Sequence, residues 1–587
     1  MTINHVPRMF AILDVSVRNC SSTKGHSGTL GYNFGLDIRQ GRWTSSLVFR
    51  AAVLALTMCL VTCGVGHASQ GGDGHHTRDF SFAAGPCPES QAASLAALKA
   101  QCGILTVPEH RPNPRGRTIQ LPVVRIPSVA QPPNPDPVVY LAGGPGTNAI
   151  PQAPILVQVG LNQNRDLIIM NQRGVALTRP ALTCPNIDRF NIEAVGLRYD
   201  SPHTGRLHVA ATKECHDALV NQGIDLSAYN TTENSADFAD LRKALRIAHW
   251  NVYGLSYGTY LALSLMRDHP EGIRSVIIDS VQPPSVATLG WTWTNANEGI
   301  NNIFRACDAQ PRCKRKYGDL ASAFAKQVSQ LEAKPLKIRG RYSPDAKPVK
   351  VVLDGGALVN WLASVPDPIM QIPSYPSAIA ELVQGRPTQI ANSRAALADP
   401  AGIGTVGYGL LYGVICREWV PFEPESQILA QGLLAFPTYP TSVLSLAPHL
   451  PFMTEDCGVW NVPRAPDSER RVTISSIPTL VMAGSFDGKT SPQWALYAAR
   501  TLQNSTTVVI PGAGHGALFL IGLPPDTPAQ SCARSVVASF LSAPMDPDVS
   551  CVANLRPLPF TISATMFPPD QIDQELQELP LLEAPMN

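Results

Sequence analysis

The chain has 587 residues, with 46 Lys or Arg against 45 Asp or Glu, so its net charge is close to neutral at +1. This balance, without a long run of like charge, argues against the basic surface of a nucleic-acid-binding protein, and we predict no nucleic-acid partner. A chain of this length can bury a large core, either as one elaborated domain or as several.

The N-terminal segment differs in composition from the rest of the chain. Arg42 and Arg50 precede the apolar stretch AAVLALTMCLVTCGVG, which is followed by the small residues GHAS. This pattern predicts a secretory signal peptide cut near Ala68, because about 16 apolar residues are fewer than a membrane span needs. A membrane anchor and lipidation at Cys63 are the alternatives. We expect a secreted or periplasmic protein with no membrane span in the mature chain.

Cleavage there leaves ten of the 13 cysteines, an even number that suits an oxidising compartment. Pairs that are close in sequence are favoured, and the alternative is that two or more of these cysteines are buried thiols. No CxxC pair occurs, and we predict neither a metal nor a cofactor. The predicted disulfides are Cys87–Cys102, Cys184–Cys215, Cys307–Cys313, Cys416–Cys457 and Cys532–Cys551.

Apolar runs alternate with helix-compatible stretches along most of the chain. The runs are VVYLAGGPG, DLIIMNQRG, NVYGLS, SVIIDS, TLVMAGSFD and TVVIPGAGH. Continuous apolar strands separated by helices predict a mostly parallel sheet with helices on both faces, an α/β fold. The rhythm breaks over residues 281–476, which predicts a large, mainly helical cap inserted between two strands. The predicted parts are a signal peptide region (1–68), a linker (69–84), a first part of the core (85–280), the cap (281–476), a second part of the core (477–555) and a C-terminal tail (556–587).

The stretch GLSYG, residues 254–258, joins a buried strand to a helix that ends near Pro270. A GxSxG pattern alone occurs by chance, and a structural turn serine is the alternative. Between a strand and a helix, however, Gly254 and Gly258 permit a tight turn that exposes Ser256 at the helix N-terminus. We therefore predict that Ser256 is the nucleophile of a hydrolase.

A serine hydroxyl needs a base within hydrogen-bond reach and an acid that orients this base. In an α/β fold with such a serine turn, both partners follow the serine along the chain, first the acid and then the histidine. Asp487 comes directly after the run TLVMAGSF, and His515 lies in PGAGHGA after the next strand. We predict Asp487 as the acid and His515 as the base, with Asp279 at the end of SVIIDS as the rival acid.

Hydrolysis also needs hydrogen-bond donors for the oxyanion of the tetrahedral intermediate. One donor is expected to be the backbone amide of Tyr257, directly after the serine. The other is expected from the glycine loop LAGGPGTN, residues 141–148, where we choose the amide of Gly144. A plain glycine turn is the alternative for this loop.

The motifs of this chain together resemble the α/β-hydrolase family of secreted prolyl and tripeptidyl aminopeptidases, with a TAP-like C-terminal region. They are GGPG (143–146), NQRG (171–174), GLSYG (254–258), FDGKTSP (486–492) and GAGHG (512–516). The resemblance covers about residues 85–555. Two positions depart from the family pattern, because Ala142 stands where the family often has histidine and Asn171 where it often has aspartate.

The resemblance implies an α/β-hydrolase fold and a peptidase that acts at the free N-terminus of a peptide. Such a site must offer a carboxylate to the buried ammonium group, because an unpaired charge in a closed pocket is costly. Glu298 and Glu418 of the predicted cap are the candidates, each with a solvated or structural role as the alternative. Arg173 is expected to brace the loop beside the site. An esterase of small esters is the rival function, and a catalytically silent binding protein is the alternative from another class.

Overall fold

The computed structural model describes residues 80–364, 370–519 and 527–562, so the predicted signal peptide, Cys63 and the end of the predicted tail lie outside the described residues. The strands of the main sheet are β1 (Ser81–Gly85), β2 (Gln101–Pro108), β3 (Thr118–Ile126), β4 (Asn134–Leu141), β5 (Arg165–Met170), β6 (Trp250–Leu255), β7 (Ile273–Asp279), β10 (Thr479–Gly484) and β11 (Ser505–Ile510).

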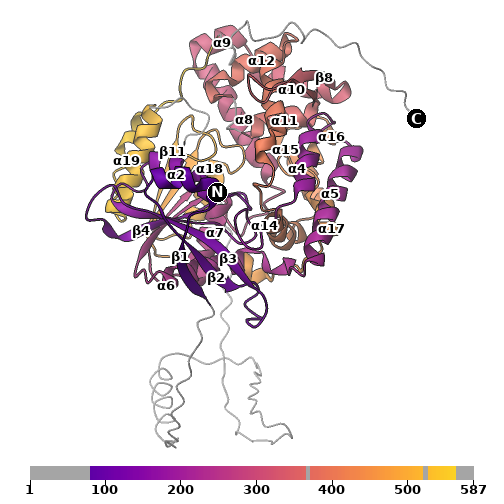
Figure 1. Cartoon of the computed structure of the whole chain (residues 1–587). Coiled ribbons are helices and arrows are strands. Elements are labelled where there is room, and N and C mark those ends of the chain that lie inside the picture. Colours follow the sequence, from indigo (N-terminus) through magenta and orange to yellow (C-terminus); the bar gives the residue numbers. More distant parts are fainter. Residues whose placement is uncertain (1–79, 365–369, 520–526, 563–587) are drawn as a thin grey trace, which may run out of the picture. The chain divides into compact units, whose positions relative to one another are not determined.

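The described residues place these strands in one nine-stranded sheet of order β1-β2-β3-β5-β4-β6-β7-β10-β11 (Figure 1). The strands from β5 to β11 in this order run parallel to their neighbours. The strands β1, β2 and β3 form an antiparallel edge beside β5. The predicted α/β fold with a mostly parallel sheet is thus confirmed.

The first strand, β1, lies where the predicted linker (69–84) meets the core. The segment SFAAG has little strand preference of its own, but it pairs antiparallel with β2. The disulfide between Cys87 and Cys102 joins the chain just after β1 to the start of β2. The strand is therefore stabilised by its pairing with β2 and by this disulfide, and its own residues do not indicate a strand.

Successive side chains of the central strands enter two separate cores on opposite faces of the sheet. In β4, Val138 and Tyr140 pack on one face, while Val139 and Leu141 pack on the other. Because both faces are covered, these strands consist of continuous apolar runs. On the face of Val138 lie α2 (Ala92–Ala97), α3 (Ala153–Gln158) and α19 (Pro528–Ser542). On the face of Val139 lie α6 (Thr231–Ala244), α7 (Tyr257–Asp268) and α18 (Pro492–Ala499).

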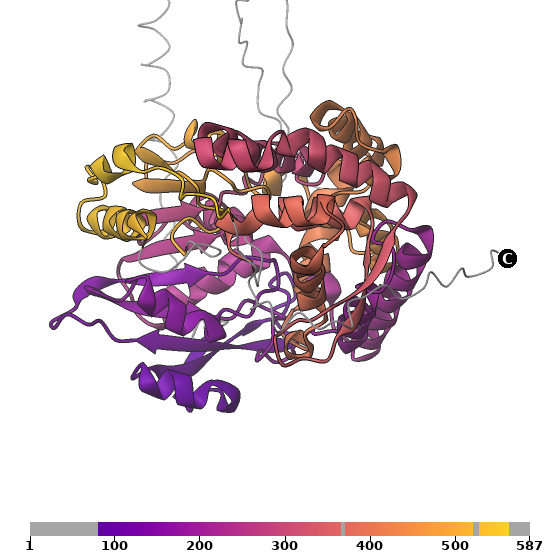
Figure 2. The ribbon, with the colours of Figure 1, turned by 90° about the horizontal axis from the view of Figure 1, so that it is seen from above.

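Between β7 and β10 the chain leaves the sheet and folds into helices and a small antiparallel sheet. Seen from above in Figure 2, the rose-to-orange helices of residues 292–444 gather on one side of the indigo strands. The small sheet consists of β8 (Leu336–Gly340) and β9 (Val349–Leu353). The helices are α8 (Thr292–Ala309), α9 (Pro311–Tyr317), α10 (Leu320–Ala333), α11 (Gly355–Ala363), α12 (Tyr375–Val383), α13 (Thr388–Ala395), α14 (Tyr408–Val414), the π-helix η7 (Ile415–Trp419), α15 (Glu425–Ala435), α16 (Thr441–Leu444) and α17 (Met453–Trp460).

Two helices from outside this insertion join its helical layer. They are α4 (Pro185–Ala194) and α5 (Pro202–Asn221), which follow β5. The helix α5 contacts α17, and α4 contacts the short helix η5 (Ala396–Ala398). The helical layer is therefore built from two separate stretches of the chain.

The disulfides bear on the compartment in which the protein works. All five predicted disulfides are present, with Cα–Cα distances of 5.0 to 5.8 Å. Five disulfides are typical of an oxidising compartment. In the part of the chain that the structure describes, no helix combines the length and the apolar character needed to cross a bilayer.

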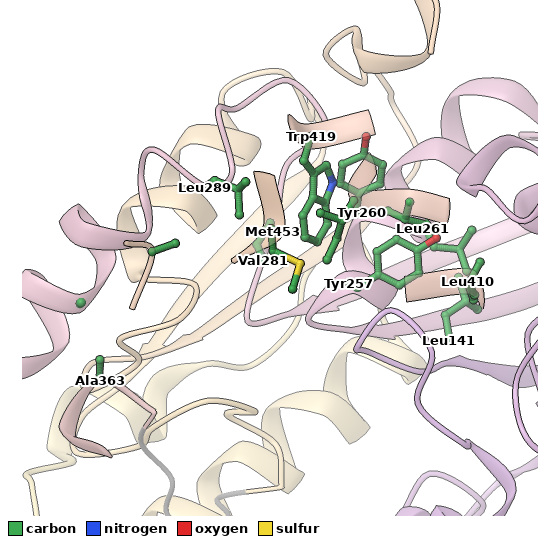
Figure 3. Packing of buried hydrophobic residues seen from close by; sticks show 14 of the residues in the cluster. Leu141, Tyr257, Tyr260, Leu261, Val281, Leu289, Ala363, Leu410, Trp419 and Met453 are labelled. Atoms are coloured by element: carbon green, nitrogen blue, oxygen red, sulfur yellow. The ribbon is translucent and has the colours of Figure 1, made fainter. Parts of the chain in front are cut away.

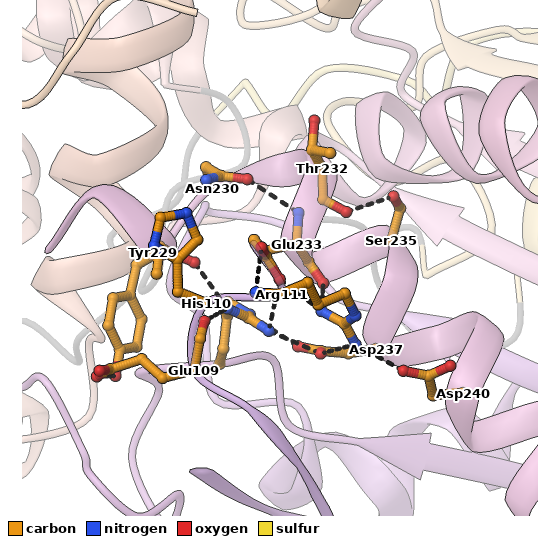
Figure 4. A network of polar contacts seen from close by, with 12 residues as sticks. Glu109, His110, Arg111, Tyr229, Asn230, Thr232, Glu233, Ser235, Asp237 and Asp240 are labelled. Carbon is orange, nitrogen blue, oxygen red and sulfur yellow. Dashed lines mark hydrogen bonds and ion pairs between the residues drawn. The ribbon is translucent and has the colours of Figure 1, made fainter. Parts of the chain in front are cut away.

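A buried ionic network ties the loop after β5 to helix α6. Arg173 is 0% exposed, and its Nε and Nη2 donate to the two carboxylate oxygens of Asp237 at 2.8 and 2.7 Å. Figure 4 shows that Arg111 approaches the same carboxylate and also reaches Glu233 and Asp240. Arg173 therefore braces the loop that follows β5, as the sequence predicted.

We expect Asp237→Asn to lower the free energy of unfolding by about 4 kcal/mol, because it leaves a buried guanidinium without its bidentate partner. Urea denaturation followed by circular dichroism measures the change. Asp217→Asn is the matched control, because Asp217 pairs with Lys213 on the surface of α5, and no measurable change is expected there. Equal stability of the Asp237 variant and the unmodified protein would contradict a stabilising role for the network.

Candidate active site

Ser256 occupies the bend between β6 and α7, with φ 57° and ψ −124°. Positive φ is unfavourable for a residue other than glycine, so the surrounding packing must hold this conformation. A Cβ atom on Gly254 would lie 2.4 Å from the carbonyl oxygen of Gly258, and one on Gly258 would lie 2.0 Å from that of Leu141. Both glycines of GLSYG are therefore required by close backbone approach, and the turn lifts Ser256 out of the strand.

Asp487 and His515 lie in direct contact beyond the ends of β10 and β11. Nδ1 of His515 is 2.9 Å from Oδ2 of Asp487, which is 0% exposed. The other carboxylate oxygen accepts hydrogen bonds from the amides of Lys489 and Thr490, both at 2.9 Å. Burial by itself raises the pKa of Asp487, but the charge of His515 and these hydrogen bonds outweigh it and hold the pKa below its ordinary value. An ionised aspartate in this place orients the imidazole and stabilises its protonated form.

The histidine loop also approaches the serine turn. A Cβ atom on Gly516, next to His515, would lie 3.6 Å from Cδ1 of Leu255, next to Ser256. Since Nδ1 of His515 faces Asp487, Nε2 is the ring nitrogen left to accept a proton. The Oγ atom of Ser256 has no hydrogen-bond partner among residues 80–364, 370–519 and 527–562. Catalytic hydrogen bonds of this kind commonly tighten only when substrate is bound.

Asp279, the rival acid, bonds to the loop that follows the histidine. Its carboxylate oxygens accept hydrogen bonds from the backbone amides of Ala517 and Leu518, each at 2.8 Å. The hydroxyl of Tyr253 donates to it at 2.9 Å. The carboxylate that bonds to the ring of His515 is therefore that of Asp487.

The two predicted oxyanion donors belong to the glycine loop and to the residue that follows Ser256. A Cβ atom on Gly143 would lie 3.0 Å from Cβ of Ser256, so the glycine loop packs directly against the serine. The next residue, Gly144, is exposed and has φ 109°. Across the described ranges, neither the amide of Gly144 nor that of Tyr257 donates to another protein group. Both amides are thus available to an oxygen bound beside Ser256.

Side chains of the NQRG segment hold the glycine loop in place. Nδ2 of Asn171 donates to Oδ1 of Asn148 at 2.8 Å, and Nε2 of Gln172 donates to the carbonyl of Ala142 at 2.8 Å. A carboxylate has no hydrogen to donate. Asn171 therefore braces the glycine loop through an N–H donor. The aspartate that the family often has at this position would lack this donor. The sequence pattern alone did not reveal this role.

Comparisons with known proteins agree with this fold. Residues 136–369 match the alpha/beta hydrolase fold family, and residues 449–551 match the family described as TAP-like protein. The chain has the α/β-hydrolase fold, and its C-terminal region is similar to the TAP-like family.

Several relatives of this α/β hydrolase are named for their activity. The serine protease Hip1 of Mycobacterium tuberculosis is 27% identical over 289 residues, which are 47% of this chain and 54% of the relative. The tripeptidyl aminopeptidase of Streptomyces lividans is 23% identical over 484 residues, which are 78% of this chain and 85% of the relative. Carboxylesterase B of M. tuberculosis is 26% identical over 237 residues, which are 39% of this chain and 45% of the relative. The match therefore spans about half the length of Hip1 and most of the aminopeptidase.

The helix α8 of this α/β hydrolase docks on the loop that carries Asp487. Nδ2 of Asn295 donates to the carbonyl of Lys489 at 2.9 Å, and Nδ2 of Asn302 donates to that of Ser485 at 2.6 Å. The first helix of the insertion and the acid of the site are thus fixed to each other. Two asparagines in a helical stretch gave no signal of this contact, because their partners lie almost 200 residues away.

The two glutamates predicted to meet a substrate amine lie in different surroundings. Glu298 of α8 lines a pocket of about 250 Å³, and its Oε2 is buried without a partner in the described part of the chain. Glu418 is 1% exposed, and its Oε1 accepts the amide of Thr231 at 2.7 Å. Only Glu298 therefore presents an unpaired carboxylate oxygen beside a pocket. The pocket is lined by Thr294, Asn297, Glu298, Asn301, Arg305 and Gln493.

Glu418 is instead a buried neighbour of the helix that begins at the serine. Figure 3 shows Trp419, the next residue, beside Tyr260 of α7, whose ring in turn stacks on that of Tyr257. Burial in these surroundings raises the pKa of Glu418 to about 7, although hydrogen bonds from Thr231 oppose this rise.

Because its pKa is raised in the folded state, Glu418 contributes stability at low pH that is lost as the pH rises through about 7. The variant Glu418→Gln keeps the acceptor for Thr231 and carries no charge. We expect the stability of this variant relative to the unmodified protein to increase by about 3 kcal/mol between pH 4.5 and pH 9. Urea unfolding at both pH values measures the difference. If the stability difference between the variant and the unmodified protein is the same at both pH values, the pKa of Glu418 is not raised by the fold.

Proposed function

We propose that this α/β hydrolase is a serine peptidase that cleaves peptide bonds near a free N-terminus through an acyl-enzyme. The observation that carries the proposal is the 2.9 Å contact between His515 and the buried Asp487, at the sheet edge where Ser256 stands in a strained turn. A nucleophile, a base and an orienting acid at one edge of a parallel sheet is the arrangement that acyl transfer requires.

In the proposed mechanism, Oγ of Ser256 attacks the carbonyl carbon of the scissile bond. Nε2 of His515 takes the hydroxyl proton and returns it to the leaving amine, while Asp487 holds the imidazole and stabilises its charge. The amides of Tyr257 and Gly144 donate to the oxyanion of the tetrahedral intermediate. Water, activated by His515, then hydrolyses the acyl-enzyme. These steps use side chains and backbone amides of the protein without a metal or cofactor.

The choice of a peptide substrate is supported by similarity to proteins named serine protease and tripeptidyl aminopeptidase. An esterase acting on small esters is the second candidate, because the same groups cleave both bonds and carboxylesterase B is also similar to part of the chain. A catalytically silent binding protein is the third. The presence of all three triad residues favours an enzyme over this last alternative.

For the substrate amine we propose Glu298. Its Oε2 is buried, has no partner within the described residues and belongs to the pocket on α8. An ammonium group entering this pocket would pair with the carboxylate, and pairing offsets the cost of burying both charges. Glu418 is disfavoured for this role, because its carboxylate already bonds to Thr231 inside the fold.

We further propose that the protein works outside the cytoplasm, as a secreted or periplasmic enzyme. The five disulfides support this location. The signal peptide predicted for residues 1–68 and the alternative of lipidation at Cys63 both fall outside the described residues.

We expect a fluorophosphonate probe to label the purified protein at Ser256 and to leave Ser256→Ala unlabelled, because only an activated hydroxyl reacts. Asp487→Asn should lower kcat by about 10⁴-fold, since it removes the charge that holds the histidine. Mass spectrometry of the labelled peptide and steady-state kinetics provide the two measurements. Labelling that persists in Ser256→Ala would exclude this residue as the nucleophile.

A library of peptides with free and blocked N-termini, compared with matched acyl esters, separates the candidate functions. Release of N-terminal fragments from free peptides alone supports the aminopeptidase. Cleavage of blocked or internal sites removes the exopeptidase proposal and leaves hydrolysis intact. Cleavage of esters alone favours the esterase.

Glu298→Gln should raise KM for substrates with a free amine by about tenfold and leave KM for blocked substrates unchanged, because only the former lose a charged partner. Glu425→Gln, at an exposed position at the start of α15, is the matched control and should leave both values unchanged. Steady-state kinetics on paired free and blocked substrates test this. An equal change for both substrates would argue against Glu298 as the amine site.

A further inference from the structure

Residues 279 and 280, at the end of β7, hold the backbone of the histidine loop. Oγ of Ser280 accepts the amide of Gly516 at 2.8 Å. The carboxylate of Asp279 accepts the next two amides, those of Ala517 and Leu518, each at 2.8 Å. Three consecutive amides directly after His515 are thus bound by two adjacent side chains, which leaves this part of the loop little freedom to shift.

The same two residues contact the segments that carry the other members of the site. The carbonyl of Asp279 accepts the amide of Ser256 at 3.0 Å. The amide of Ser280 donates to the carbonyl of Met482 at 2.9 Å, in the strand that leads to Asp487. One dipeptide therefore touches the serine turn, the acid strand and the histidine loop.

Burying Asp279 and straining Ser280 both cost free energy, which indicates that this dipeptide has a function beyond stability. Asp279 is 0% exposed, and burial raises its pKa, with the hydrogen bonds from Leu518, Ala517 and Tyr253 opposing the rise. Within the described ranges no Lys or Arg pairs with its carboxylate. A buried carboxylate without a cationic partner is expensive. Ser280 adds strain, because it has φ 60° without being glycine.

We infer that Asp279 and Ser280 are positioning residues that set the placement of His515 relative to Ser256 and Asp487. The inference rests on the proposed hydrolase function. Asp279 acts through the backbone of residues 516–518 and does not take part in proton transfer, which distinguishes it from Asp487.

The test compares Asp279→Asn and Ser280→Ala with the unmodified protein in steady-state kinetics and fluorophosphonate labelling. The asparagine places an N–H group against a backbone amide, so the loop must move. We expect kcat and the labelling rate to fall by about 100-fold for Asp279→Asn and roughly tenfold for Ser280→Ala, with KM nearly unchanged. Val276→Ala is the matched control, because it removes a buried side chain from the same strand and should lower stability without changing kcat.

The outcomes separate the two proposals. An unmodified protein that neither hydrolyses substrate nor reacts with the probe overturns the proposed function itself. A reactive unmodified protein with unchanged kcat in both variants overturns the positioning role alone. A fall in kcat that Val276→Ala reproduces at equal loss of stability also overturns it. If Asp279→Asn does not fold, Ser280→Ala, which removes a single acceptor, decides the question.

Discussion

The parallel alignment of β6, β7, β10 and β11 is the constraint on which the site depends. Neighbouring parallel strands end at the same edge of a sheet, so residues from positions 256, 279, 487 and 515 meet there. Burial of both faces keeps the strands in register, because a shift by one residue would move apolar side chains to the wrong core. The packing of the sheet thus brings these positions together, and no large movement of the chain is needed.

The loop that carries Asp487 is held both by the insertion and by the chain that follows residue 555. The asparagines of α8 bond to the backbone on either side of Asp487. From the other end of the chain, Phe560 stacks on Phe486, with ring centroids 6.4 Å apart, and its amide donates to Gln310 at the end of α8. The first residues of the predicted C-terminal tail are therefore part of the support of the acid.

The disulfide pairs could be predicted, and the triad candidates could be proposed, because each has a local signal. Ser256 stands between glycines after an apolar run, and the cysteines pair with near neighbours. The hydrogen bonds from the histidine loop to Asp279 had no such signal. The donors lie about 240 residues away and are backbone amides, which almost any residue supplies. The packing of α5 on α17 was missed for the same reason. Local pattern indicates elements and motifs, whereas long-range polar contacts depend on tertiary structure.

Two fully buried aspartates at one sheet edge differ in pKa because their partners differ. Asp487 interacts with the imidazole of His515 and accepts hydrogen bonds from backbone amides, and its pKa falls below the ordinary value. Asp279 has mainly neutral donors, which only partly offset burial, so its pKa rises. The ionised form is therefore favoured for Asp487, which the proposed mechanism needs as an anion. It is less favoured for Asp279, which only has to accept hydrogen bonds. The distinction between an orienting acid and a positioning residue is thus set by what each carboxylate contacts, since burial is the same for both.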